Sequence, residues 1–386
     1  MLNAKLLYAT SARIGGSGLD SVALESLRAS HRAGFLKRAI AFDNRQREIP
    51  SALIRSLRAH PVRLLSFLDK PHYYGAKKHY LDWIAARELS RGDYTIFHGW
   101  SGECVRTLRA ACRRGIPSLI EIPTWHRNKG KHKPTKTKSE RERDAATGLQ
   151  RIFNNMLVSR QQVLEEYDLA TLILVLSEKA AETFLAAGIP EKKLFRHSRG
   201  VDVERFMPAE KPPEIFRAVF VGALIKRKGV HHLLEAWRRL NLRNAELVLV
   251  GSVHDEIKPA LHEFVGENVR VAGFAANTQD FYRAASVHIF PSSCEGSAKA
   301  TYEAAACGLP QITTRESGDI VIDGVNGLII PPENPDALAD AISKLYVDPD
   351  LRARMGAASR QRVVEHFTWE HFRNRLLAAY RAALQA

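Results

Sequence analysis

Short apolar runs alternate with amphipathic segments along the whole chain. In the first half the runs are KLLYAT, KRAIAF, DYTIFHG, IPSLIEIP and ATLILVLS, and in the second half they are RAVFVG, AELVLVG, NVRVAG, SVHIFPS, PQITT and GLIIPP. Helical patterns lie between them, as in residues 19–34, where Gly34 is expected to end the first helix. This alternation predicts βαβ units and therefore mainly parallel sheets.

A break in the pattern lies near residues 201–216, VDVERFMPAEKPPEIF. Three prolines (Pro208, Pro212 and Pro213) and several charges replace the apolar periodicity there, which is typical of a linker. The 386 residues are too many for one ordinary core, and the break divides them into similar halves. We therefore predict two Rossmann-like, doubly wound parallel-sheet domains facing across a cleft, with ligands beyond the carboxyl ends of the strands.

The composition predicts a globular protein that does not span a membrane. Hydrophobic residues make up 45% and charged residues 26% of the chain. The longest apolar run, at residues 169–176, is far shorter than the roughly 20 residues that span a bilayer. The start, MLNAKLLYATSARIGG, resembles a first strand more than a signal peptide. We expect a cytoplasmic protein.

The chain has four cysteines, which are Cys104, Cys112, Cys294 and Cys307. They show neither the CxxC spacing nor the Cys/His spacing of zinc sites. Isolated thiols are typical of a reducing compartment, so we expect these residues to act as buried small hydrophobic side chains.

The formal net charge is +15, and part of it is concentrated in residues 127–143, RNKGKHKPTKTKSERER. Such a run is usually a solvated loop. Its functional interpretation is contact with an anionic partner, whether phosphate, nucleic acid or the acidic face of a membrane. The run lacks interleaved aromatic residues and helical amphipathy, so sequence-specific nucleic-acid binding is poorly supported.

Residues 221–230, VGALIKRKGV, form the first candidate site. An apolar run ends at Gly222 and a helical pattern follows. Helix N-termini favour phosphate because their N–H groups are unpaired and the helix dipole is positive there. Lys226, Arg227 and Lys228 on this turn predict a diphosphate site, and the alternative is an ordinary basic turn.

A second glycine loop, SARIGGSGLDS at residues 11–21, lies between the first predicted strand and the first predicted helix. It has neither GxGxxG spacing nor the GxxxxGKS or GxxxxGKT pattern of a P-loop. Two interpretations stay open, which are close approach of the backbone to a ligand and a tight turn between strand and helix.

Residues 295–303, EGSAKATYE, contain two glutamates eight positions apart. Glu295 is expected in the loop at the carboxyl end of a strand, and Glu303 in a helix that ends at Gly308. Each carboxylate can accept hydrogen bonds from hydroxyl groups, one on each of two sugar rings. The amides from Gly296 onward offer N–H donors between them. The alternative is a pair of exposed helix carboxylates.

With these motifs the chain resembles the retaining glycosyltransferases of family 4, which have the GT-B fold. The resemblance lies in E-x7-E after a strand, followed by AAACGLP, and in VGALIKRKGV, GVDVERF at 200–206 and residues 319–342. It covers the whole second half of the chain. In the first half it is mostly architectural and includes the early glycine loop.

The resemblance implies roles for individual residues. Lys228 matches the lysine that binds the donor diphosphate, and Glu303 matches the glutamate that hydrogen-bonds the donor ribose. Glu295 and the amides of residues 296–299 match the loop that contacts the hexose hydroxyls, and Gly16 matches a glycine whose backbone approaches the donor phosphate. The implied donor-binding set is Gly16, Gly222, Lys226, Arg227, Lys228, Glu295, Gly296, Ser297, Ala298, Lys299 and Glu303.

The chain departs from the family pattern at three positions. Ala223 replaces the usual arginine after the glycine of the phosphate loop, and Lys226 or Arg227 is the candidate for supplying the missing charge. Ala298 replaces the second glycine of the loop around the hexose, which implies a tighter path. Arg199 replaces the usual asparagine before GVD and is a further candidate cation for the cleft.

The family also uses a histidine of the first domain near the transferred sugar. His98 and His126 both come at predicted strand ends, and we favour His126 because its strand leads directly into the basic run. The alternative is a hydrogen-bonded structural histidine. Glu121 is a further cleft candidate. The predicted catalytic residues are His126, Glu295 and Lys228.

We expect no metal and no cofactor besides the sugar nucleotide, which is the donor substrate. The DxD pattern of the chain, Asp348-Pro349-Asp350, lies in a proline-containing link between two helical segments, which is a poor metal site. The cationic loop and the helix dipole are expected to stabilise the leaving diphosphate instead.

The sequence thus predicts an acceptor-side domain at residues 1–205, a donor-binding domain at 206–366, and a helix at 367–386 that crosses back to the first domain. The predicted reaction is retaining transfer of a hexose from a nucleotide diphosphate sugar to a glycan or glycolipid hydroxyl, in cell-envelope polysaccharide or lipopolysaccharide synthesis. Peripheral contact with an acidic membrane is predicted through residues 127–143. The alternatives are an epimerase or phosphorylase of the same fold, and a basic nucleic-acid-binding protein.

Overall fold

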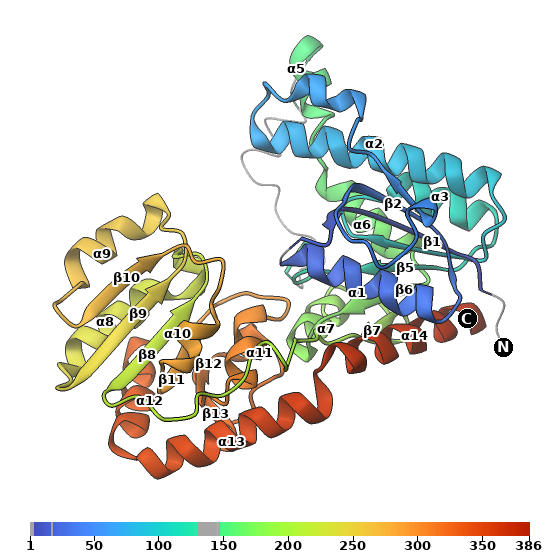
Figure 1. Cartoon of the computed structure of the whole chain (residues 1–386). Coiled ribbons are helices and arrows are strands. Elements are labelled where there is room, and N and C mark those ends of the chain that lie inside the picture. The colour runs from blue at the N-terminus through green and yellow to red at the C-terminus, as the bar shows by residue number, and fades with distance from the viewer. Residues whose placement is uncertain (1–3, 17, 130–144, 146) are drawn as a thin grey trace. The chain divides into compact units, whose positions relative to one another are not determined.

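The computed structural model describes residues 4–16, 18–129, 145 and 147–386 (Figure 1). The chain forms two compact units. The first comprises Met1–Val175, Ala181–His197 and Arg373–Ala386, and the second comprises Leu176–Ala180 and Ser198–Phe372. Most of the basic run at 127–143 lies outside the described residues.

The first unit contains a seven-stranded parallel sheet with the order β3-β2-β1-β4-β5-β6-β7. Its strands are β1 (Leu6–Ile14), β2 (Leu36–Asn44), β3 (Ile54–Ser56), β4 (Ile96–Trp100), β5 (Ser118–Glu121), β6 (Leu172–Val175) and β7 (Leu194–Arg196). The five long apolar runs of the first half are thus confirmed as strands. The two edge strands, β3 and β7, were not predicted because three residues are too few to show a pattern.

Helices cover both faces of this sheet. They are α1 (Leu19–Arg32), α2 (Lys70–Arg91), α3 (Val105–Arg113), α5 (Gly148–Asn154), α6 (Arg160–Leu169), α7 (Glu178–Leu185) and the C-terminal α14 (Trp369–Gln385), with short 3-10 turns η1 (Ser51–Leu53), η2 (Pro61–Leu65) and η3 (Glu191–Lys193). Helices α2, α3 and α6 pack side by side. Helix α14 is held to α1 by Arg373, whose Nη1 lies 2.6 Å from Oε2 of the buried Glu25.

The second unit contains a six-stranded parallel sheet with the order β10-β9-β8-β11-β12-β13. Its strands are β8 (Phe216–Val221), β9 (Ala245–Val250), β10 (Val269–Gly273), β11 (Val287–Phe290), β12 (Gln311–Thr313) and β13 (Gly327–Ile329). Its helices are α8 (Val230–Leu240), α9 (Lys258–Phe264), α10 (Gln279–Arg283), α11 (Lys299–Ala306), α12 (Pro335–Val347) and α13 (Pro349–His366), with 3-10 turns η4 (Lys226–Lys228), η5 (Asp255–Ile257) and η6 (Arg315–Ser317). All six strands predicted for this half are confirmed.

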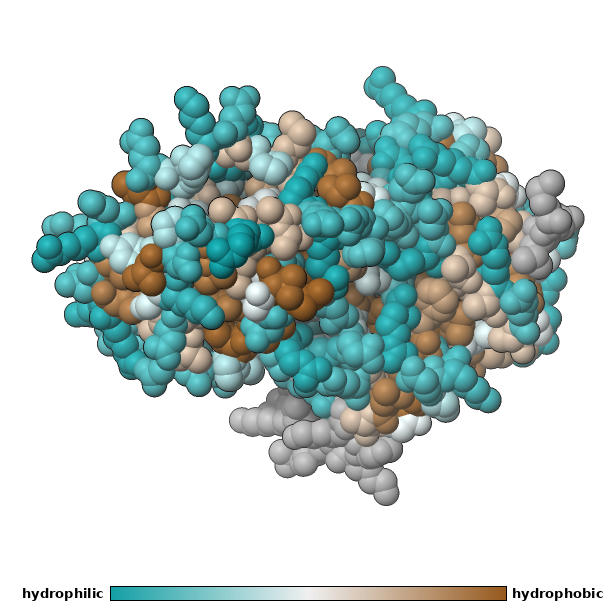
Figure 2. Space-filling view, turned by 90° about the horizontal axis from the view of Figure 1, so that it is seen from below, coloured by the Kyte–Doolittle hydropathy of each residue, from teal (hydrophilic) through white to brown (hydrophobic). Residues whose placement is uncertain are grey.

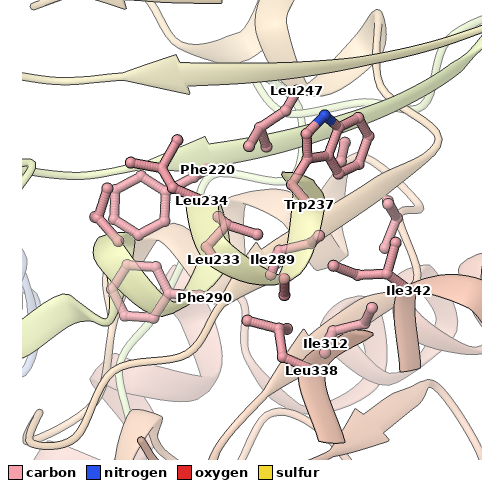
Figure 3. Close-up of a cluster of buried hydrophobic side chains, with 14 of the residues drawn as sticks. Phe220, Leu233, Leu234, Trp237, Leu247, Ile289, Phe290, Ile312, Leu338 and Ile342 are labelled. Atoms are coloured by element: carbon pink, nitrogen blue, oxygen red, sulfur yellow. The ribbon is translucent and has the colours of Figure 1, made fainter. Parts of the chain in front are cut away.

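Strand β8 shows why these runs are apolar throughout. Successive side chains of a strand point to opposite faces, and here both faces are buried: Phe220 contributes to one core cluster while Val219 and Val221 contribute to the other. In the first cluster, side chains of α8 such as Leu233 and Trp237 pack against the sheet and against α12 (Figure 3). The sheet is therefore covered by helices on both faces, as doubly wound sheets are.

Among the described residues, no helix is both long and apolar enough to cross a membrane. The face seen in Figure 2 is mostly hydrophilic, with hydrophobic side chains in small separate groups. Cys104 and Cys307 are buried as expected. The expectation is wrong for Cys112, which is exposed on the last turn of α3, and for Cys294, which is only half-buried.

Candidate functional site

The loop between β8 and α8 is shaped by two glycines. Gly229 has a φ of 71°, in the left-handed region where side chains other than glycine are strained. A β-carbon at this position would also lie 2.2 Å from the carbonyl oxygen of Pro291. At Gly222 a β-carbon would meet the Nζ atom of Lys228 at 2.9 Å. The glycines therefore allow the turn η4 to fold back against the end of the sheet.

Lys228 and Arg227 converge on one carboxylate. The Nζ atom of Lys228 lies 3.8 Å from Oε1 of Glu295, and Nη1 of Arg227 lies 2.9 Å from the same oxygen. The side chains of Lys228 and Glu295 are 18% and 17% exposed, so both are half-buried. Burial lowers the pKa of Lys228 and Arg227 lowers it further, while the charge of Glu295 opposes them. The ammonium also lies 5.0 Å from the ring centre of Phe290.

The two candidates for the charge missing at Ala223 differ in position. Arg227 shares the carboxylate of Glu295 with Lys228. Lys226 has an exposed side chain, and its backbone N–H donates to Oε1 of Glu256 at 3.1 Å. Of the two, Arg227 is therefore the cation that the fold places beside Lys228.

Hydrogen bonds from several parts of the second unit hold the loop after β11. The N–H of Glu295 donates to the carbonyl of Glu316 at 2.9 Å, and the N–H of Ala298 donates to the carbonyl of Ser317 at 2.8 Å. The amide of Ala298 is therefore already hydrogen-bonded within the protein, although the sequence suggested it as a donor for a ligand. The hydroxyl group of Ser297 hydrogen-bonds that of Tyr302 at 2.9 Å.

Two further contacts hold the backbone of this loop. The Oγ of Ser177 donates to the carbonyl of Gly296 at 2.7 Å, and Nε of Arg199 donates to the carbonyl of Ser297 at 2.7 Å. Arg199, predicted as a cleft cation, thus braces the loop through its guanidinium group.

Glu303 is buried inside α11, with 5% of its surface exposed. Its Oε1 lies 2.8 Å from Nζ of Lys299, and its Oε2 accepts a hydrogen bond from the hydroxyl of Tyr282 at 3.2 Å. Burial and then the charge of Glu303 raise the pKa of Tyr282 well above its usual value, and the same causes raise the pKa of Cys307 to about 12. The alternative of two exposed helix carboxylates is therefore wrong. Sequence reasoning missed Tyr282, because its helix α10 carries no signal for contact with α11.

Gly16 of the first unit is constrained by the protein itself. Its N–H donates to the carbonyl of Arg13 at 2.9 Å. A β-carbon there would lie 2.3 Å from Oδ2 of Asp20, whose other oxygen accepts the N–H of Arg13 at 2.9 Å. Only a glycine therefore fits beside the carboxylate of Asp20, and the approach of the Gly16 backbone to a donor phosphate stays a prediction.

His98 and Glu121 lie in the interior of the first unit. His98 is in the middle of β4 and 0% exposed, which corrects the prediction that it follows a strand. Its Nδ1 lies 2.8 Å from the hydroxyl of Tyr380 on α14, and its Nε2 lies 3.3 Å from Oε1 of Glu121. Burial alone would raise the pKa of Glu121, but His98 and His197 together lower it. This buried network anchors α14 to the sheet.

His126 is also buried, with 4% of its surface exposed. Its backbone N–H donates to Oγ1 of Thr183 at 3.0 Å, and its Nδ1 accepts the N–H of Asn128 at 3.1 Å. The ring packs against Tyr167 and Phe184, with ring centres 5.0 and 4.9 Å away. Within its own unit the residue closes a turn, and its predicted catalytic role stays a prediction.

The DxD pattern forms a helix cap. The carboxylate of Asp348 accepts the N–H of Leu351 at 2.8 Å at the start of α13, and Pro349 occupies the first helical position. The part of the chain that the structure describes contains no group of three or more His, Cys, Asp or Glu side chains arranged to hold a metal ion.

These observations define a protein of two Rossmann-like units, in which cations and carboxylates gather at the carboxyl ends of β8 and β11. Ligands of doubly wound sheets bind at such positions. Within the described residues no direct contact joins Lys228 to Glu303. Lys228 contacts Glu295, and the loop that begins at Glu295 leads into α11, which carries Glu303.

Residues 204–362, which lie in the second unit, match the family described as Glycosyl transferases group 1. The chain's curated relatives include the capsular polysaccharide biosynthesis glycosyltransferase CapM of Staphylococcus aureus, 29% identical over 52% of this chain and 60% of the relative. The D-inositol 3-phosphate glycosyltransferase of Kribbella flavida is 32% identical over 59% of this chain and 60% of the relative. The chain thus spans no more than about 60% of the length of these relatives.

Solved structures of the same fold cover nearly the whole chain. The sucrose-phosphate synthase of Thermosynechococcus elongatus has a TM-score of 0.72 at 19% identity and covers 98% of both chains. HepE of Anabaena, solved in complex with UDP and glucose, has a TM-score of 0.67 at 16% identity and covers 98% of this chain and 100% of its own. The predicted GT-B fold of two Rossmann-like units is confirmed.

Proposed function

We propose that this protein transfers a hexose from a nucleotide diphosphate sugar to a hydroxyl group of a glycan or glycolipid. The observation that carries the proposal is the convergence of Lys228 and Arg227 on Glu295 at the carboxyl end of β8. The half-buried ammonium group of Lys228, with the exposed guanidinium group of Arg227 beside it at this end of a doubly wound sheet, suits a diphosphate. The family match, and the relatives named as glycosyltransferases, support the same reaction.

The chemistry requires stabilisation of the charge that develops on the leaving diphosphate. We assign this role to Lys228, whose ammonium group lies beside Gly222 and 5.0 Å from the ring centre of Phe290 at the end of the sheet. Arg227 adds a second charge. Glu295 and Glu303 are acceptors for hydroxyl groups of the hexose and the ribose, and the bond from Tyr282 fixes the orientation of the Glu303 carboxylate.

Several finer points are part of the proposal and rest on the family resemblance. They are retention of the anomeric configuration, independence of a metal ion, a contribution of His126, and a place in cell-envelope polysaccharide or lipopolysaccharide synthesis. The name of CapM, which refers to capsular polysaccharide biosynthesis, supports the last point. Location at the inner face of the cytoplasmic membrane, with contact through residues 127–143, rests on the charge of that run.

A first experiment screens the full chain by thermal shift against nucleotide sugars, since a ligand that binds only the folded state raises the melting temperature. A hit is then tested for acceptor-dependent release of the nucleoside diphosphate. Lys228→Ala and Glu303→Gln are expected to lower kcat/KM by at least tenfold. The control is Arg354→Ala, an exposed residue of α13, which should have no effect.

Three results would contradict the proposal. Conversion of the nucleotide sugar without an acceptor would favour an epimerase. Activity with inorganic phosphate in place of a nucleotide would favour a phosphorylase. Full activity of Glu303→Gln would remove the role assigned to the buried carboxylate.

A further inference from the structure

A group of large hydrophobic side chains in the first unit projects into solvent. Leu64 is 81% exposed, Phe67 is 78% exposed and Tyr74 is 50% exposed. They belong to residues 58–74, which comprise η2, the link after it and the start of α2; we call this the 58–74 surface. Isolated exposed apolar residues are common, but a cluster of this kind marks an interaction site.

The backbone of this segment explains why these side chains project together. Successive hydrogen bonds join the N–H of Ser66 to the carbonyl of Arg63 at 3.0 Å and the N–H of Leu68 to the carbonyl of Leu65 at 3.1 Å. In such a 3-10 arrangement residues three positions apart lie on the same side. Leu64 and Phe67 therefore share one side of the segment, and Lys70 follows as the first residue of α2.

The segment is fixed to the unit at both ends. At its start the buried ring of His60 packs on Phe42, with ring centres 5.2 Å apart. At its end Asp69 caps α2, because its carboxylate accepts the N–H of His72 at 3.0 Å. Leu64 and Phe67 thus lie on a segment that is anchored to the rest of the unit at both ends.

The charges of the surface are mostly positive. Residues 58–74 contain three cations, Arg58, Arg63 and Lys70, all of them exposed. The one carboxylate in this stretch, Asp69, is used as the cap of α2. Hydrophobic side chains beside exposed cations fit the boundary of an acidic bilayer, where the apolar groups enter below the headgroups and the cations meet anionic lipids.

We propose that the 58–74 surface binds an acidic lipid bilayer, with Leu64 and Phe67 inserted among the acyl chains and Arg58, Arg63 and Lys70 at the headgroups. A second copy of the chain suits this surface less well. A contact between two copies through this surface would bury the cations of both, and the cores of protein interfaces are depleted of charged residues. The inference does not rest on the proposed transfer reaction, because membrane binding is measured without donor or acceptor.

The test measures partition of the full chain onto vesicles of phosphatidylglycerol and phosphatidylcholine by flotation. We expect binding to the acidic mixture that weakens as salt is added, and little binding to pure phosphatidylcholine. The double variant Leu64→Ser/Phe67→Ser should lower the partition coefficient at least about tenfold. Arg63→Gln/Lys70→Gln should lower it by a similar factor and flatten the salt dependence.

Two matched controls should bind as the wild type does. Phe274→Ser removes a side chain that is 80% exposed in the second unit. Lys192→Gln removes an exposed cation of η3, next to the edge strand β7, which lies at the opposite edge of the sheet from β3. Since all the replaced residues are exposed, unchanged melting temperatures are expected and would show that the variants fold.

The proposal is overturned if the wild type does not bind acidic vesicles, or if Leu64→Ser/Phe67→Ser binds them as well as the wild type does. The second result would place the contact elsewhere, for example in the basic run. It is also overturned if light scattering shows that these substitutions convert a dimer to a monomer while vesicle binding persists.

Discussion

The ammonium group of Lys228 lies 3.8 Å from a carboxylate oxygen of Glu295, although the residues belong to different βα loops. Lys228 follows β8 and Glu295 follows β11, and these strands are neighbours in the sheet. The pairing therefore joins the two motifs that the sequence singled out separately. Each residue influences the other electrostatically, because both side chains are half-buried.

Glu295→Gln should move the alkaline limit of nucleotide binding to lower pH. Burial already lowers the pKa of Lys228, and Glu295 is the neighbour that raises it. Without that carboxylate the pKa falls further, so the protonated form that binds a diphosphate is lost at lower pH. Calorimetric titration with a nucleoside diphosphate between pH 7 and 11 measures the shift. Glu263→Gln, an exposed control in the same unit, should leave the profile unchanged, and an unshifted profile in Glu295→Gln would show that the two groups are not coupled.

Arg227→Ala should weaken binding of a nucleoside diphosphate more than Lys226→Ala does. Charge-assisted hydrogen bonds contribute about 1.5–3 kcal/mol, so a loss of tenfold or more is expected for Arg227, which lies beside Lys228. Lys226, with its exposed side chain, should cost less than threefold. The dissociation constants of the two variants for a nucleoside diphosphate test this prediction. Equal losses of affinity would mean that both cations replace the charge that is missing at Ala223.

Tyr282→Phe should reduce nucleotide affinity without loss of the fold. The substitution removes the hydroxyl that donates to Oε2 of Glu303. The raised pKa of Tyr282 keeps this hydroxyl protonated over the physiological range, so it is a permanent donor. We expect a loss of about 1 kcal/mol in stability and a severalfold loss in affinity for a nucleoside diphosphate, but not for inorganic pyrophosphate, which lacks a ribose. An equal loss for pyrophosphate would contradict the assignment of Glu303 to the ribose.

Gly229→Ala should destabilise the protein more than Gly273→Ala. Both glycines have left-handed φ values, 71° and 72°, so both substitutions cost about 1–2 kcal/mol in backbone strain. At Gly229 the new carbon would also meet the carbonyl oxygen of Pro291, whereas nothing lies within 4 Å of it at Gly273. The clash adds about 1–3 kcal/mol. Chemical denaturation of both variants measures the difference in the free energy of unfolding. Similar values would show that the loop at Pro291 moves aside without loss of stability.

Glu166→Gln should remove a component of the pH dependence of stability. Burial raises the pKa of Glu166 to about 7, although the N–H groups of Gly102 and Cys104 donate to its carboxylate. In the unfolded chain the pKa of Glu166 is near its ordinary value of 4.5. Between pH 4.5 and 7 the Glu166 carboxyl group is therefore protonated in the folded state and ionised in the unfolded state. The stability that this proton contributes is complete below about pH 4.5 and is lost as the pH rises through 7.

The wild type should therefore lose up to about 3 kcal/mol relative to Glu166→Gln between pH 4.5 and 8. Chemical denaturation of both proteins across this range measures the change. The adjacent Glu165 provides a control of opposite sign, because its hydrogen bond with Arg109 lowers its pKa. A flat difference between Glu166→Gln and wild type would show that Glu166 is ionised throughout.

Most strands could be predicted because parallel strands buried on both faces are apolar without interruption. The run of β8, in which Phe220 and Val221 face opposite core clusters, illustrates this. The edge strands β3 and β7 could not be predicted, since each has three residues and is buried at only one of them. Strand length and burial thus determine which strands the apolar pattern can predict.

The sequence by itself determined the alternation of most strands and helices along the chain, the glycine turns and the local position of Lys228 and Glu295, because these depend on spacing along a few residues. Only the tertiary structure decided which of these groups meet. It joined Glu303 to Tyr282 and Arg227 to Glu295, and it enclosed His98 beside Tyr380, 282 residues away in the sequence. Such contacts depend on the order of the strands in the sheet and on how the helices pack. The pattern of apolar and polar residues along the chain does not specify which individual residues these two arrangements bring together.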